Sequence, residues 1–395
     1  MSASEVDADF YWPLDDNTVF DPYPAYAKLR EAGPVLWHKT MRCWLVTSRE
    51  HAVEVLSDSA TYARDWRRAG AEVAEDRLSV QNLDPPEAVP VRRACRRFLD
   101  HADVRAQLTA GIGSFLEERL ELAAPNAEFD LLAEVVSPVG RELVARFLGR
   151  GVTPQPNDLA DLVDGITSGM DAGLDPDRHG EAERRRAAFN GVVARAMSGT
   201  PRRELLSRLL HEFDESRVSG AVAFNSVRVV VLSLYAAVTG AIANVAHTLL
   251  KLPGETAADV LGAAKKGSVD ELLRFDNVVQ ATTRVAIHTT TLAGQTICAG
   301  EDVTVMLGAA NRDPAAFSNS DAVCPQRSHN PHLSFSHGAH LCLGPDLGRA
   351  IVATALNALG NPRFVLESAG PPSYLPTATM RRINVLPVRV RSAQP

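Results

Sequence analysis

The sequence predicts a mainly helical protein with a minor β part, and three features carry this prediction. Amphipathic patterns interrupted by short polar breaks fill the middle of the 395-residue chain. Short segments rich in β-branched and aromatic residues lie near both ends of the chain, bounded by Gly and Pro. With 45% hydrophobic and 23% charged residues, the composition is that of a globular protein with a large core.

The N-terminal part is expected to mix helix and strand. A helix is predicted over residues 23–32, because Gly33-Pro34 directly follows it. Residues 35–48 hold β-branched and aromatic side chains around a basic turn and predict a strand pair, followed by a helix over 49–56. Pro85 and Pro86 exclude helix until the chain has passed them.

The central part is predicted to be helical from residue 89 to residue 224, with polar breaks between the helices. An uncharged run from Val229 to Leu250 is long enough to span a bilayer. Polar residues inside it, such as Asn244 and His247, favour instead a long helix buried in a soluble protein, so no membrane is expected. A short helix is predicted over 269–275.

The C-terminal part returns to strands and then to one helix. Residues 311–344 are expected to be irregular. A helix over 345–359 begins with a proline at the first position, where the missing N–H does no harm. The predicted strands in this part are 284–287, 290–292, 296–298, 303–306 and 383–390.

Charge and cysteine content restrict the class of protein. The 41 basic and 48 acidic residues give a net charge of −7, which argues against non-specific nucleic-acid binding because that needs a basic field. The five cysteines form no CxxC pair, so neither a disulfide framework nor a zinc finger is indicated. The acidic N-terminus lacks the apolar core of a signal peptide, and a reducing cytoplasm is the expected compartment.

The segment from His329 to Gly344 is the richest candidate site, with four histidines and Cys342. Zinc prefers such ligands, but the spacing matches no zinc pattern. A buried cysteine among surface histidines is the structural alternative. The third hypothesis is an iron site, in which glycines let the backbone fold about the Cys342 sulfur and the next helix points its N–H groups at a thiolate.

Several motifs resemble the cytochrome P450 family. Phe335-Ser-His-Gly-Ala-His-Leu-Cys-Leu-Gly344 resembles its haem-binding loop, FxxGxxxCxG, and Ala310–Phe317 resembles the segment before that loop. Glu271-Leu-Leu-Arg274 resembles the family's ExxR motif, and Arg327 stands where a third charged partner is expected. Leu83–Glu87 followed by Arg92 resembles the start of its C helix, and residues 20–35 resemble the N-terminal helix of its soluble bacterial members.

This resemblance implies the P450 fold, a triangular helical prism around haem, in a single domain over 1–395. The expected β-rich part comes from about 35–60, 284–310 and 375–392, and the helical part from about 87–280 and 345–360. It also implies haem b with Cys342 as the thiolate ligand, and O₂ as co-substrate. The other implied site residues are Phe335, Gly338 and Gly344 in the loop, Arg92, Arg284 and His340 as partners of the haem propionates, and Glu271, Arg274 and Arg327 as a buried charged lock behind the loop.

The chain departs from the family pattern at three places. Ala88 replaces a histidine of the C helix, so one propionate contact is missing, and Ser336 replaces a glycine of the loop. In the central helix we match the family's AGxDT pattern to Ala236–Gly240, so that Thr239 stands for the acid and Gly240 for the alcohol. Because neither supplies the usual proton-delivery pair, we expect water ordered by Thr239, a polar group of the substrate itself, or an oxidative coupling that inserts no oxygen.

The expected function is therefore a tailoring oxidase or monooxygenase of secondary metabolism, such as antibiotic biosynthesis. The alternative is a non-catalytic relative that activates a partner enzyme such as a glycosyltransferase, although such relatives have typically lost the cysteine. An acidic ferredoxin or flavodoxin would deliver electrons by docking on the basic cluster Arg93, Arg96 and Arg97. A bulky natural product is the expected substrate, in a pocket lined by Leu232, Ser233, Ala236, Ala237, Val278, Val279 and Thr379.

Overall fold

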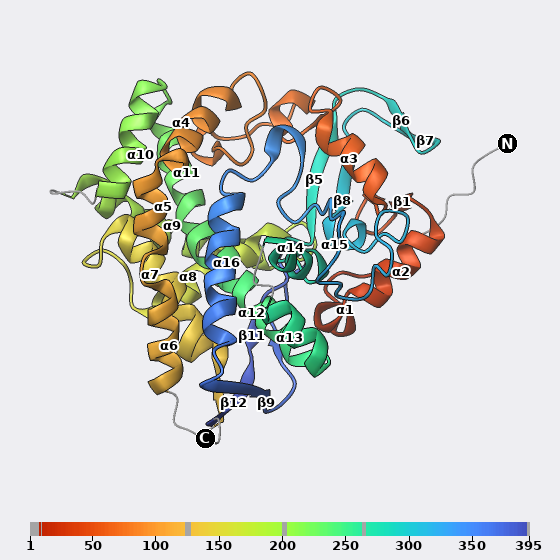
Figure 1. Ribbon diagram of the computed structural model, residues 1–395. Coiled ribbons are helices and arrows are strands. Elements are labelled where there is room, and N and C mark those ends of the chain that lie inside the picture. Colours follow the sequence, from red (N-terminus) through yellow and green to blue (C-terminus); the bar gives the residue numbers. More distant parts are fainter. Residues whose placement is uncertain (1–7, 9, 123–127, 200–203, 263–265, 393–395) are drawn as a thin grey trace.

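The computed structural model describes residues 8, 10–122, 128–199, 204–262 and 266–392 (Figure 1). About 55% of the chain is helical, which confirms the predicted mainly helical class. Its α-helices are α1 (Asp16–Phe20), α2 (Tyr23–Ala32), α3 (Arg49–Ser57), α4 (Ala88–Asp100), α5 (Ala102–Thr109), α6 (Ile112–Leu122), α7 (Ser137–Leu148), α8 (Pro156–Ser168), α9 (Arg178–Ser198), α10 (Glu204–Glu215), α11 (Gly220–Leu232), α12 (Val238–Lys251), α13 (Gly254–Gly262), α14 (Lys266–Phe275), α15 (Leu307–Ala310) and α16 (Pro345–Leu359).

Shorter helical turns and strands complete the fold. The 3₁₀ turns are η1 (Trp66–Ala69), η2 (Glu75–Arg77), η4 (Gly169–Asp171) and η6 (Gly338–His340), and the π turns are η3 (Leu132–Val136) and η5 (Ser233–Ala237). The strands are β1 (Val35–His38), β2 (Cys43–Val46), β3 (Tyr62–Ala63), β4 (Glu128–Asp130), β5 (Ala281–Ala286), β6 (Thr290–Leu292), β7 (Gln295–Ile297), β8 (Asp302–Met306), β9 (Phe364–Ser368), β10 (Ser373–Tyr374), β11 (Ile383–Val385) and β12 (Pro387–Ser392).

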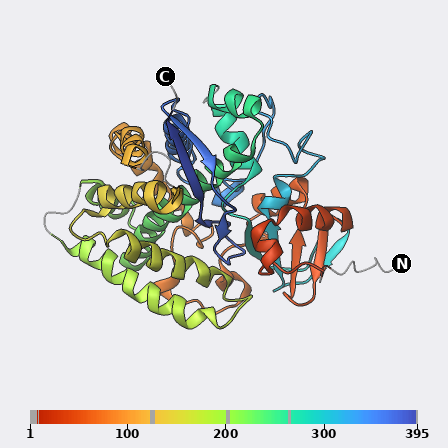
Figure 2. The ribbon, with the colours of Figure 1, turned by 90° about the horizontal axis from the view of Figure 1, so that it is seen from below.

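The largest sheet joins the N-terminal region to the segment after α14. Its order is β1-β2-β8-β5-β3, with β2 and β8 parallel and the other pairs antiparallel. The sheet lies on one side of the molecule, and the helices α7 to α11 lie on the other (Figures 1 and 2). The register of β3 on β5 pairs Tyr62 with Ala286 and Ala63 with Val285, which brings the next residue, Arg64, opposite Arg284.

The C-terminal strands correct one expectation. The single strand predicted over 383–390 is wrong, because the chain forms β11 and then β12, which belong to different sheets. Pro387 starts β12, and a proline has no N–H to continue an unbroken ladder. β12 pairs with β4 and β9, two strands that the sequence analysis did not predict.

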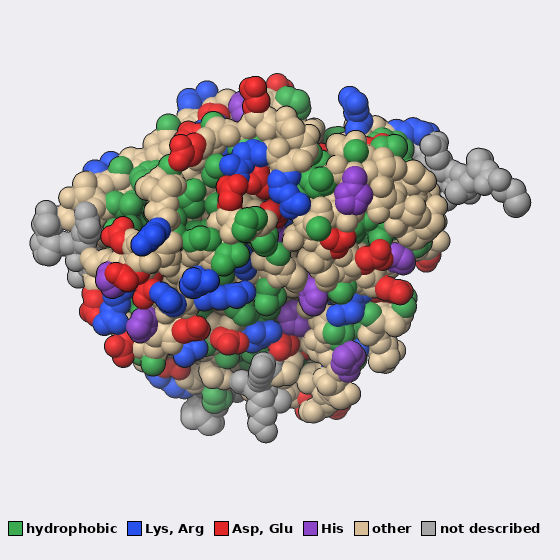
Figure 3. All heavy atoms as spheres, turned by 90° about the horizontal axis from the view of Figure 1, so that it is seen from above, with side chains coloured by type: hydrophobic (Ala, Val, Ile, Leu, Met, Phe, Trp, Pro, Cys, Tyr) green, Lys and Arg blue, Asp and Glu red, His purple; other side chains and the backbone are tan. Residues whose placement is uncertain are grey.

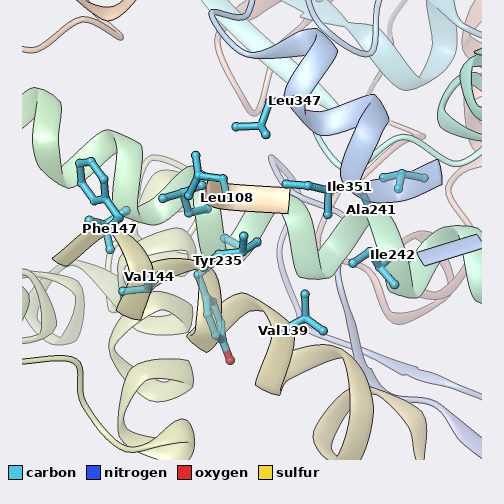
Figure 4. Close-up of a cluster of buried hydrophobic side chains, with 14 of the residues drawn as sticks. Leu108, Val139, Val144, Phe147, Tyr235, Ala241, Ile242, Leu347 and Ile351 are labelled. Carbon is cyan, nitrogen blue, oxygen red and sulfur yellow. The ribbon is translucent and has the colours of Figure 1, made fainter. Parts of the chain in front are cut away.

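The main core lies between the helices. Figure 4 shows part of it, where side chains from α5, α7, α12 and α16 meet around Tyr235 of η5. α11, η5 and α12 form one continuous run, Gly220–Lys251, which is long and apolar enough to cross a membrane by length and composition. However, 61% of its most apolar stretch is buried inside the protein, as in the core helix of a soluble protein.

Candidate functional site

The loop that carries Cys342 folds back on itself immediately before α16. The N–H of Cys342 donates to the carbonyl of Phe335 at 2.9 Å, and the N–H of Leu341 donates to the carbonyl of Gly338 at 3.0 Å. The Phe335 ring packs under the guanidinium of Arg349, 4.6 Å from its centroid, and so ties the loop to α16. This packing fixes the position of Cys342 relative to the start of that helix.

Gly338 is required in this loop for two reasons. Its φ of +67° lies in the left-handed region, and a Cβ atom there would lie 2.1 Å from the carbonyl oxygen of Leu56 in α3. Ser336 also has a positive φ, +63°, without the freedom of the glycine that it replaces. The backbone therefore keeps the path that glycine usually permits, with some strain at Ser336.

The Cys342 side chain is accessible in the structure. Burial raises the pKa of its thiol, opposed by the Gly344 N–H and by the charges of Arg92 and Arg349. Yet the residue is exposed, and its neighbour Leu341 keeps 37% of its surface accessible. The accessible Cys342 sulfur therefore lies close to the helix N-terminus that begins at Pro345.

Glu271, Arg274 and Arg327, the residues predicted to form a charged lock, lie together in one buried cluster. Glu271 receives two hydrogen bonds of 2.8 Å from Arg274 and one of 2.9 Å from Arg327. Burial alone would raise the pKa of Glu271, but these bonds outweigh it and lower the pKa. Arg274 also donates to the carbonyls of Asn311 and Ser320, so the lock joins α14 to the segment that leads into the cysteine loop.

A second ion-pair cluster, which sequence reasoning missed, supports the same loop. Asp270 accepts from Arg349 Nε at 2.6 Å and lies 3.2 Å from His332 Nε2. His332 in turn accepts from the Ser334 N–H through Nδ1. Asp270 directly precedes Glu271, so its position next to the ExxR motif was the signal that could have pointed to it.

The three predicted propionate partners lie in a region of unbalanced positive charge. Arg284 is 2% exposed, and burial lowers its pKa to about 9. Arg92 donates to the carbonyl of Leu341 in the cysteine loop. His340 Nε2 lies 2.7 Å from Asp84 Oδ1, while its Nδ1 is buried without a hydrogen-bond partner. Among the described residues Arg92 and Arg284 form no ion pair, so the donor set fits a ligand with two carboxylates.

The central helix turns Thr239 and Gly240 away from its accessible side. The Thr239 hydroxyl donates to the carbonyl of Tyr235 at 2.8 Å, and the side chain is 0% exposed. Its methyl group faces Gly140 of α7, where a Cβ would lie 2.5 Å away. A Cβ on Gly240 would lie 3.1 Å from Val278. The structure therefore does not bring these two positions together at the accessible face.

Ser233 and Ala237 occupy that face instead. Ser233 is exposed and Ala237 is half-buried, at the two ends of the π turn η5. The Ser233 hydroxyl donates to the carbonyl of Val229 at 2.8 Å. The accessible face thus carries one hydroxyl and no acid.

The predicted pocket segments after α14 and before β11 lie side by side. Gln280 N–H donates to the carbonyl of Thr379 at 2.9 Å, and Val279 forms a bridge with Met380. Thr379 donates its hydroxyl to Asp171 at 2.6 Å, a buried acid that sequence reasoning missed. Of the other predicted pocket residues, Leu232 and Val279 are half-buried, whereas Ala236 and Val278 are buried.

The predicted basic cluster lies on α4. Arg93, Arg96 and Arg97 are exposed, and Arg97 lies 3.9 Å from Glu212 of α10. Figure 3 shows the molecule from above, where basic side chains gather in small groups next to acidic ones. The cluster is therefore available to a partner, but partly balanced by acids.

The family model Cytochrome P450 matches residues 266–359, which include the lock and the cysteine loop. Cytochrome P450 monooxygenase PikC of Streptomyces venezuelae is 29% identical, over 96% of this chain and 93% of that protein. The 20-oxo-5-O-mycaminosyltylactone 23-monooxygenase of Streptomyces fradiae is 28% identical, over 88% of this chain and 84% of that protein.

Solved structures agree with the fold. The crystal structure of CalO2 superposes with a TM-score of 0.82 at 23% identity, covering 97% of this chain and 99% of that chain. P450BioI, solved with an acyl carrier protein, gives 0.80 at 24% identity, covering 95% and 99%. The predicted family, fold, oxidoreductase class and haem b cofactor with thiolate ligation and O₂ are confirmed. Residues 266–359 of this chain thus match the cytochrome P450 family model, and the chain is similar to cytochrome P450 proteins over most of its length.

Proposed function

We propose that this protein is a tailoring oxidase of natural-product biosynthesis in which Cys342 is the haem ligand. The single observation that carries the proposal is the accessible sulfur of Cys342, which precedes the start of α16 in a loop fixed by backbone hydrogen bonds. Relatives named for natural-product steps, among them nocardicin C N-oxygenase of Nocardia uniformis subsp. tsuyamanensis, support the tailoring role. A non-catalytic auxiliary role is not favoured, because the cysteine loop is intact.

The residues around the loop would divide three tasks. When bound, the haem supplies the activation of O₂ by successive electron transfers. The Gly344 N–H and the N-terminus of α16 stabilise negative charge on the Cys342 sulfur. Arg92, Arg284 and His340 would hold the two propionates, with the positive charge supplied by the two arginines. The Glu271 lock holds the segment from Asn311 to the loop in place.

Proton delivery would differ from the family's usual route. We propose that the accessible positions of the central helix are Ser233 and Ala237, not the Thr239 and Gly240 expected from the sequence. The Ser233 hydroxyl orders water, but its ordinary pKa is too high for it to act as an acid. A polar group of the substrate would therefore take part in proton delivery. Alternatively, the reaction would be an oxidative coupling that inserts no oxygen.

The ligand assignment is tested by reduction with dithionite under carbon monoxide. The wild-type protein should show the Soret band typical of thiolate ligation, and Cys342→Ser should lose it, because a neutral hydroxyl is a poor ligand. Cys298→Ser is the matched control, since Cys298 is exposed and lies after β7, away from the loop. A thiolate band that survives Cys342→Ser would mean that another residue is the ligand.

The electron donor is proposed to be an acidic ferredoxin or flavodoxin that docks on Arg93, Arg96 and Arg97 of α4. Replacing all three by Gln should slow electron delivery at low salt and flatten its salt dependence. An unchanged rate and salt dependence would remove this docking site.

The substrate is proposed to be bulky. The small side chain of Ala237 leaves room at the accessible face of the central helix, whereas Ala236 and Gly240 are buried. The half-buried Val279 and Thr379 lie on the two neighbouring segments. Polycyclic or macrocyclic ligands should therefore shift the spin state of the iron on titration. A shift produced only by short fatty acids would contradict this substrate class.

A further inference from the structure

Arg64 is a charged residue that is not among the expected partners of the haem propionates. It follows β3 directly, and the antiparallel register with β5 places it opposite Arg284. Like charges directly opposite each other on neighbouring strands destabilise a sheet. Burial lowers the pKa of both guanidinium groups, because water compensates their charge poorly there.

The two guanidinium groups share their protein acceptors. Nη1 of Arg64 donates to Thr282 Oγ1 at 2.7 Å and to the Thr283 carbonyl at 3.0 Å. Nη1 of Arg284 donates to the same two atoms, at 2.9 Å each. A guanidinium carries five N–H donors, so most donors of both groups have no acceptor within the described part of the chain.

The nearby acid does not balance this charge. Asp84 uses Oδ1 for His340 at 2.7 Å. Its Oδ2 accepts from the backbone N–H groups of Arg64 and Asp65 and lies 3.3 Å from Arg68 Nη1. Asp84 therefore holds the backbone of this turn and the His340 ring, and two guanidinium groups remain without a carboxylate partner in the described residues.

We propose that Arg64 binds a haem propionate together with Arg284, in place of the C-helix histidine that Ala88 replaces. The proposal rests on the proposed haem site at Cys342. Ala88 offers no side-chain donor, whereas Arg64 brings a charged fork to the same end of the site through the turn at Asp84. A dianionic ligand also removes the repulsion that the β3–β5 register creates.

A purely structural role for Arg64 makes a different prediction. If Arg64 only fastened the end of β3 to Thr282 and Thr283, its loss would weaken the protein regardless of the charge on the propionates. The two roles are therefore separated by changing the charge of the ligand as well as that of the residue.

The experiment measures haem release from the holoprotein into an excess of apomyoglobin. Arg64→Gln should accelerate release about tenfold, and Arg64→Lys, which keeps the charge, about threefold or less. Arg67→Gln is the matched control, because Arg67 lies in the same turn but is paired with Asp65 and Glu87. It should stay within about twofold of the wild type. Equal release from Arg64→Gln and Arg67→Gln would overturn the proposal.

The second measurement repeats the comparison with haem dimethyl ester, whose propionates carry no charge. For this ligand Arg64→Gln should release no faster than the wild type. An undiminished tenfold effect would show that Arg64 does not act on the propionates. If Arg64→Gln yields no holoprotein, the Lys variant is measured with both ligands instead. If the wild-type protein itself lacked the thiolate band, the proposed haem site at Cys342 would be wrong. That outcome differs from a failure of the Arg64 proposal alone, in which the wild type keeps the band.

Discussion

At the scale of single residues, the cysteine loop requires glycine at position 338 but not at position 344. A Cβ on Gly338 would lie 2.1 Å from a backbone oxygen of Leu56, at a φ of +67°. The nearest atom to a Cβ on Gly344 would be 3.7 Å away, which is ordinary contact. Both glycines belong to the motif, but only the first is demanded by local geometry.

We therefore expect Gly338→Ala to displace the loop from α3 and to lower haem occupancy several-fold, because the backbone of both segments must move. Gly344→Ala is the control and should retain haem close to the wild-type level. Haem content per protein, measured by absorbance after purification, checks both variants. Full occupancy in Gly338→Ala would mean that the loop has more freedom than its contacts indicate.

The residue scale also shows what the sequence could predict. The resemblance predicted roles for Cys342, Arg92, Arg284 and His340 without any structure, because each of these positions can be matched within a short local segment. Arg64 could not be found in that way. Its position next to Arg284 depends on the register of β3 on β5, two strands that are far apart in the sequence.

At the scale of elements, the central helix is the place where sequence reasoning chose Thr239 and the structure shows a different accessible face. The pattern that normally marks the register is absent, so the match relied on small residues. The π turn η5 adds one residue to a helical turn and rotates every later side chain by about 100°. A periodicity count that assumes regular α-helix through this turn assigns the wrong face.

This difference in register predicts opposite results for two variants. With surrogate substrates that lack a polar group, Ala237→Thr should improve the coupling of reductant to product, because it adds a hydroxyl at the accessible face. Gly240→Thr should give no gain and should lower stability, since its Cβ already lies 3.1 Å from Val278. Reductant consumption and product are measured together. A large gain from Gly240→Thr alone would restore the register expected from the sequence.

At the scale of the whole molecule, the site is assembled from segments that are far apart in the chain. The main sheet joins residues 35–63 to residues 281–306, and the Glu271 lock joins α14 to the approach of the cysteine loop. Composition and periodicity predicted the helical and β-rich segments. They could not predict that β4 and β9 pair with β12, because such pairing depends on long-range contacts.

The same assembly buries a histidine that makes stability depend on pH. His247 of α12 lies 3.1 Å from the Tyr374 hydroxyl near β10, and burial lowers its pKa to about 4, with a further lowering by Lys251. Its pKa in the unfolded chain is about 6.5. Between these values the unfolded chain binds a proton that the folded protein does not, so the stabilisation is complete above about pH 6.5 and is lost as the pH falls.

The expected loss between pH 7.5 and pH 5 is about 1 to 2 kcal/mol, after allowance for partial solvent screening. His247→Gln keeps a polar group beside Tyr374 but cannot titrate, so its stability should fall less over this range. The urea midpoint, followed by the helical circular dichroism signal, measures the difference at both pH values. His179→Gln, at an exposed position, is the control and should follow the wild type. An acid sensitivity of His247→Gln equal to that of the wild type would show that other groups govern the response.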